Sequence, residues 1–186
     1  LAKQAHEVGI KEVVVWDHAL YDLDYYPDEF KTGPDSTINL DNPAFWQWFK
    51  ADYRDMLDRI PEIDGIVLTF IETGAHVEDQ YSEEMPTDEE KLARLVDELA
   101  SVLIDEYDMA LYVRTFIYTQ KELDTILKCL NLIEHDDITV MMKEVPHDFF
   151  LTHPVNEHIK EINRPVIIEF DGGHEFNGQE IGRAHV

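Results

Sequence analysis

Short apolar runs recur along the chain and alternate with longer segments whose apolar residues have helical spacing. The runs are four or five residues long and rich in β-branched or aromatic side chains, and they occupy residues 13–16, 66–70, 110–113, 138–142 and 166–170. Continuous apolar runs of this length are typical of parallel strands whose sheet is buried on both faces. We therefore predict a parallel sheet built from these five strands.

The segments between the runs carry signals for helix starts. Asn42 can cap a helix that has Pro43 at its first position. Residues 87–90 and 119–122 both read Thr-x-x-Glu, the pattern of a capping box, and apolar residues at helical spacing follow each. Strands that alternate with helices in this way predict an α/β protein.

Two α/β architectures fit this alternation: a doubly wound open sheet and a (β/α)8 barrel. In a barrel, functional side chains lie at the carboxyl ends of several strands. Ionisable residues follow every predicted strand, in the order Asp17-His18, Glu72, Arg114, Lys143 with His147-Asp148, and Glu169 with Asp171, His174 and Glu175. A glycine-rich phosphate-binding loop follows none of them. The sequence thus favours an incomplete (β/α)8 TIM barrel with about five of its eight strand–helix units.

The two ends of the chain differ from the rest. Residues 1–10 read as the end of a helix and lack a signal-peptide pattern. Residues 181–186, IGRAHV, match one reading frame of a sequencing adapter, so we expect them to be a non-native tail. Residues 1–180 are then expected to form a single partial barrel domain.

The net charge of the chain argues against two classes of binding partner. The formal net charge is -25, from 40 acidic and 15 basic residues, and nucleic acids and anionic membranes both require a basic surface. We therefore expect neither as a partner, while nothing in the sequence specifies an oligomeric state. The single cysteine, Cys129, excludes a disulfide within the chain and lies in a helical pattern that predicts a core position.

Acids at the tips of parallel strands suggest glycoside hydrolysis. In a partly desolvated barrel mouth, a carboxylic acid such as Glu72 is suited to donate a proton near neutral pH. Trp16 presents an aromatic face for a sugar ring, as do Tyr25, Tyr26 and Phe149. Arg114 and Lys143 suit a substrate that carries a carboxylate or phosphate. Asp17 and His147 are further substrate-binding candidates, because they also follow strands.

Two other functions remain open. A metal-dependent hydrolase would draw ligands from His18, His147, His153 and His174 together with Asp17, Asp148 and Glu175. These residues are scattered over loops and form neither an HxH nor an HExxH motif. A carbohydrate-binding barrel without catalysis is the other alternative. The glycosidase interpretation needs no metal or organic cofactor.

Four stretches resemble a known family in their order and spacing: NPAFWQWFKADYRDMLDRIPEIDGIVLTFIETG, ALYVRTFIY, VMMKEVPHDFFLTHPV and RPVIIEFDGGHEFNGQ. From about Asp41 to Gln179, the chain is similar to the α-glucuronidases of glycoside hydrolase family 67. The resemblance implies an inverting enzyme that releases glucuronic acid or 4-O-methylglucuronic acid from xylo-oligosaccharides.

The same resemblance implies roles for individual residues. Glu72 matches the general acid, and Asp148 and Glu175 match the two carboxylates that handle the attacking water. An inverting mechanism would separate Glu72 from that pair by roughly 6.5 to 9.5 Å. Arg114 and Lys143 match basic residues around the uronate carboxylate. The chain departs from the family in lacking the lysine just before the acid and in the loop ETGAHVED.

Overall fold

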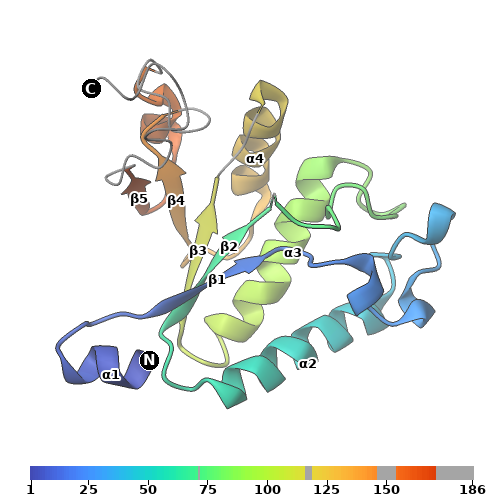
Figure 1. Ribbon diagram of the computed structural model, residues 1–186. Helices are drawn as coiled ribbons and strands as arrows, with labels where there is room; N and C mark the ends of the chain where they lie inside the picture. Colours follow the sequence, from blue (N-terminus) through green and yellow to red (C-terminus); the bar gives the residue numbers. More distant parts are fainter. Residues whose placement is uncertain (71, 116–118, 146–153, 171–186) are drawn as a thin grey trace, which may run out of the picture.

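The computed structural model describes residues 1–70, 72–115, 119–145 and 154–170. Strands and helices alternate along this part of the chain (Figure 1). Its α-helices and strands, in chain order, are α1 (Ala2–Glu7), β1 (Val14–His18), α2 (Pro43–Arg59), β2 (Gly65–Thr69), α3 (Asp88–Leu103), β3 (Ala110–Arg114), α4 (Gln120–Leu132), β4 (Thr139–Lys143) and β5 (Val166–Glu169). The predicted α/β class is confirmed.

The five strands form one sheet in which every neighbouring pair is parallel. All five predicted strands are present, each within two residues of its expected ends. The strand order, β1-β2-β3-β4-β5, follows the sequence. A doubly wound sheet reverses its strand order at a switch point, and the described strands contain no such reversal.

The helix starts follow the sequence signals. The Asn42 side chain accepts a hydrogen bond from the backbone N–H of Ala44, with Pro43 at the first position of α2. Thr87 and Thr119 each form a complete capping box at the start of α3 and α4. Between β1 and α2 the chain forms three short 3-10 helices, Leu23–Tyr25, Asp28–Phe30 and Pro34–Ser36, which the sequence patterns did not predict.

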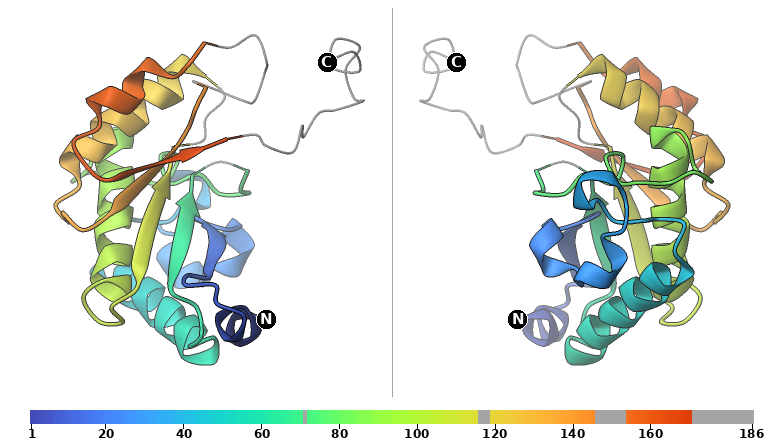
Figure 2. Two further views of the ribbon diagram at one scale, coloured as in Figure 1. Left: turned by 90° about the vertical axis from the view of Figure 1, so that its left-hand side faces the viewer. Right: turned by 90° about the vertical axis from the view of Figure 1, so that its right-hand side faces the viewer.

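The hydrophobic core lies between the sheet and the helices α2, α3 and α4, which occupy one side of the sheet (Figures 1 and 2). Side chains alternate along a strand, and the strand residues in this core follow that rule: Ile66, Leu68, Leu111, Val113, Val140 and Met142. Cys129 is fully buried within the same core, as predicted.

The intervening residues point to the opposite face of the sheet, away from α2, α3 and α4, which we call the far face. It carries Trp16 of β1, Val67 and Thr69 of β2, Arg114 of β3, Lys143 of β4 and Glu169 of β5 near the carboxyl ends of the strands. Polar and aromatic residues thus collect on this face, whereas the core face is apolar except for Asp17 of β1.

The outer strands predict self-association of the isolated 186-residue chain. β1 and β5 each pair with one neighbour in the described sheet, and Ile167, Ile168 and Phe170 at the β5 edge are 41%, 41% and 66% exposed. An exposed apolar edge strand is a template for pairing with another chain. Sedimentation should show oligomers or aggregates, and Ile168→Lys should reduce them. A cooperative, monomeric chain would contradict this prediction.

Candidate active site

Glu72 lies just beyond β2, at the carboxyl-terminal edge of the sheet, and its side chain is exposed. Its backbone has φ of 62°, in the left-handed region that non-glycine residues adopt infrequently. This conformation costs on the order of 1 kcal/mol for a residue with a Cβ. The exposure differs from the expected partial desolvation, whereas the position at a strand tip agrees with the prediction.

The loop after Glu72 is attached to the segment that follows β1. The backbone N–H groups of Gly74 and Ala75 both donate to the carbonyl oxygen of Tyr21, each at 3.0 Å. The Thr73 hydroxyl donates to the carbonyl oxygens of Leu20 and Tyr21. These bonds tie the tips of β1 and β2 together and fix the direction in which the chain leaves Glu72.

Arg114 and Glu169 form a two-point ion pair on the far face. Nε and Nη2 of Arg114 donate to the two carboxylate oxygens of Glu169 at 2.8 and 2.6 Å. The guanidinium carbon also lies 4.7 Å from the centroid of the Trp16 ring. Arg114 and Trp16, both predicted site residues, are therefore in contact, and Glu169 completes a group that spans β1, β3 and β5.

Lys143 also lies on the far face and is only 4% exposed. Its register partner on β5 is Glu169, so it lies close to the Arg114–Glu169 pair. Thr69 of β2 is fully buried on this face, and its hydroxyl oxygen has no hydrogen-bond partner in the described part of the chain. The carboxyl-terminal end of the far face thus holds two cations and a buried, unpartnered hydroxyl.

Asp17 points to the other face of β1, toward α2, and so does not meet Trp16 or Arg114. Its carboxylate accepts hydrogen bonds from the Tyr53 hydroxyl at 2.7 Å and from the backbone N–H of His18 at 2.9 Å. It lines a cavity of about 310 Å³ with tyrosine rings of the β1–α2 connection. Burial raises the pKa of Asp17, and the hydrogen bond from Tyr53 partly offsets this effect.

The raised pKa predicts how Asp17 affects stability. The folded state holds the proton more tightly than the unfolded state, so this group lowers the free energy of unfolding as pH rises from about 4 through the folded pKa. Asp17→Asn removes the charge. The asparagine amide can still form hydrogen bonds with the Tyr53 hydroxyl and the backbone N–H of His18. Urea titrations at several pH values measure the free energy of unfolding of both proteins. The value for the variant minus the value for the wild type should increase as pH rises over this range. A difference independent of pH would contradict this expectation.

The remaining predicted site residues lie outside the described residues. These are Asp148 and Glu175, the expected partners of Glu72, and His147, the expected substrate ligand. Glu72 is therefore the one predicted catalytic acid with a described position, and the convergence of three acids stays a prediction.

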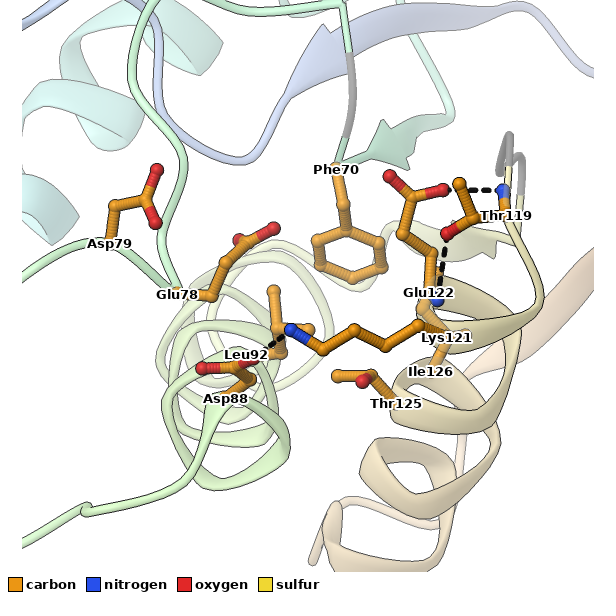
Figure 3. A pocket seen from close by; sticks show the side chains of 10 residues that line it. All are labelled: Phe70, Glu78, Asp79, Asp88, Leu92, Thr119, Lys121, Glu122, Thr125 and Ile126. Carbon is orange, nitrogen blue, oxygen red and sulfur yellow. Dashed lines mark hydrogen bonds and ion pairs between the residues drawn. The ribbon is translucent and has the colours of Figure 1, made fainter.

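A further pocket lies between the first turns of α3 and α4 (Figure 3). It has a volume of about 250 Å³, and Glu78 and Phe70 face it together with Lys121, whose Nζ is 3.8 Å from a carboxylate oxygen of Asp88. Burial raises the pKa of Glu78. The sequence did not mark Glu78 as a candidate, because it follows no strand directly. The pocket lies on the helix side of the sheet, so it is separate from the far face.

The predicted metal ligands do not form a cluster in the part of the chain that the structure describes, where no three His, Cys, Asp or Glu residues are placed to bind a metal ion together. His147, His153, His174, Asp148 and Glu175 are outside that part. Among the described helices, none combines the length and apolar character needed to cross a bilayer.

Comparisons with known protein families, with curated proteins and with solved structures find no match for this chain.

Proposed function

We propose that the chain forms part of the (β/α)8 barrel of a glycoside hydrolase that inverts configuration, with Glu72 as its general acid. The observation that carries the proposal is the placement of Glu72: an exposed acid in a left-handed conformation at a strand tip. Glycine would adopt this conformation without strain. Asp35, Ser36 and Asp108 also have positive φ, but of these four residues Glu72 is the one that follows the carboxyl end of a strand, which supports a need for its carboxyl group.

The stagger of side chains on the far face supports a closed barrel. Trp16 is in register with Tyr112, two residues before Arg114, and Arg114 is in register with Ile167, two residues before Glu169. From one strand to the next, the position of the contacting residues thus shifts by one residue toward the carboxyl end. Eight strands with a shear of eight have this stagger, and their inward side chains form layers from alternate strands. Trp16, Arg114 and Glu169 have the arrangement of such a layer.

In the proposed reaction, Glu72 protonates the glycosidic oxygen as the bond to the anomeric carbon breaks. Asp148 and Glu175, assigned by the family resemblance, activate a water molecule that attacks from the opposite face of the sugar ring. The tie between the loop after Glu72 and Tyr21 supports this role, because a general acid requires a fixed position relative to the leaving oxygen.

The charge of the far face supports an anionic sugar as substrate. Arg114 and Lys143 lie near its carboxyl-terminal end, where Glu169 pairs with Arg114 and is in register with Lys143. Two largely buried basic side chains at this place stand out in a chain whose net charge is -25. A sugar with a carboxylate, such as glucuronic acid linked to xylo-oligosaccharides, is the substrate that such a surface favours.

The test is hydrolysis of glucuronosyl xylo-oligosaccharides by the full-length protein, followed by NMR of the sugar first released. We expect an anomer of opposite configuration to the substrate, and activity that EDTA does not change. Retention of configuration would exclude the inverting mechanism. Loss of activity with EDTA would favour metal-assisted hydrolysis, and binding without turnover would favour a carbohydrate-binding protein.

A further inference from the structure

The group formed by Trp16, Arg114 and Glu169 connects three strands across the far face. Two hydrogen bonds to Glu169 fix the plane of the Arg114 guanidinium. The side chains of Arg114 and Glu169 are only 9% and 20% exposed, so this pair is largely shielded from water. An ion pair of this kind is well suited to hold a neighbouring ring in one orientation.

Trp16 differs from its two partners, because it is 51% exposed although the Arg114 guanidinium lies over its ring. It does not belong to the hydrophobic core of the described residues, whereas its neighbour Val15, on the other face of β1, packs against that core. Among the described strands the indole is therefore held by a cation and is half-exposed, on the face of the sheet where the proposed substrate binds. An aromatic ring in this situation provides a surface for an apolar ligand face.

We propose that Trp16 is the platform on which a pyranose ring of the substrate stacks, and that Arg114, held by Glu169, is a positioning residue for this ring. This inference rests on the proposed glycoside hydrolase function. It assigns Arg114 a different role from that implied by the family resemblance, in which it binds the uronate carboxylate directly. One edge of the Arg114 guanidinium, formed by Nε and Nη2, is bonded to Glu169, so this edge serves the ion pair. In this role Trp16 contacts the C–H face of the sugar ring, and the contact does not depend on the substituents that the ring carries.

Two ligands that differ only in the uronate group distinguish the two roles considered for Arg114, which are to position the ring and to bind the uronate directly. Affinities for glucuronosyl xylo-oligosaccharides and for the same oligosaccharides without the uronate are measured by calorimetry in a Glu72→Gln background, which prevents turnover. Trp16→Ala should weaken binding of both by about tenfold or more, as for a central aromatic anchor, and Trp16→Phe should lose much less. Arg114→Lys keeps the charge but loses the two-point pair, so it should weaken both ligands by a similar factor. A selective loss of the uronate ligand in Arg114→Lys would overturn the positioning role.

Fluorescence tests the platform directly. In a Trp46→Phe/Trp48→Phe/Glu72→Gln variant, Trp16 is the remaining tryptophan of these 186 residues, and the emission that a further Trp16→Phe change removes is its signal. Bound sugar should protect this emission from acrylamide quenching. Binding by calorimetry without protection, or no binding of either oligosaccharide, would overturn the platform. Protection together with a wild-type protein that hydrolyses neither oligosaccharide would leave the platform in place and refute the hydrolase. If the triple variant does not fold, the affinities of Trp16→Ala and Trp16→Phe decide the question alone.

Discussion

Glu72→Gln is expected to lower kcat for glucuronosyl xylo-oligosaccharides by about 10²-fold or more, which is the usual contribution of general acid catalysis. Glutamine has nearly the same size as glutamate but cannot supply the proton that the leaving oxygen requires. Substrate affinity should therefore change little. Aryl glucuronides whose leaving group departs without protonation should lose much less activity, and steady-state kinetics with both substrates measures this difference.

Two variants serve as controls for the Glu72 prediction. Glu84→Gln changes another exposed acid of the same β2–α3 connection and should retain wild-type turnover. Glu72→Gly should abolish turnover while preserving or slightly raising the thermal midpoint, because glycine relieves the left-handed backbone conformation. Unaltered turnover of Glu72→Gln, or a large loss of stability in Glu72→Gly, would show that Glu72 has another role.

Arg114→Met is expected to destabilise the fold by about 3 kcal/mol or more, because it leaves the Glu169 carboxylate largely buried without its two donors. Methionine retains much of the apolar stem, so the change reports chiefly on the lost ion pair. Urea unfolding followed by circular dichroism measures the difference. Replacing both residues, in Arg114→Met/Glu169→Met, should recover part of the loss, because the Glu169 carboxylate is then no longer left without its donors.

Arg54 provides the matched control for Arg114. It also forms a two-point pair, with both Nε and Nη2 at 2.7 Å from the carboxylate oxygens of Glu106, but these side chains are 37% and 40% exposed. Arg54→Met should cost about 1 kcal/mol or less, because water can solvate the remaining carboxylate. Equal effects at the two sites would refute the importance of burial for the Arg114–Glu169 pair.

The secondary structure was predictable because its signals are local. A capping box needs residues only three positions apart, and the strands are short apolar runs, so α3, α4 and all five strands follow from the sequence. The 3-10 helices after β1 have no comparable repeating pattern. The backbone conformation of Glu72 depends on the contacts of its loop with residues 20 and 21, which are distant in sequence.

The site was only partly predictable, for geometric reasons. The rule that functional residues lie at strand ends selects both Trp16 and Asp17. Side-chain alternation, however, places these two adjacent residues on opposite faces of β1. The Arg114–Glu169 pair depends on the stagger between β3 and β5, which no local pattern encodes. The sequence marks Glu169 only as an ionisable residue at a strand end, and its contacts with Arg114 place it on the far face.

The two capping boxes have a consequence for how this protein could diversify. Because Thr87 and Thr119 satisfy the helix starts from within their own segments, α3 and α4 do not depend on the connections that precede them. In the connection before α3, Val77 and Gln80 are buried, but the exposed residues next to the capping box can vary while the scaffold keeps its stability. Libraries that randomise the exposed residues Glu83, Glu84 and Pro86 should therefore yield mostly folded proteins.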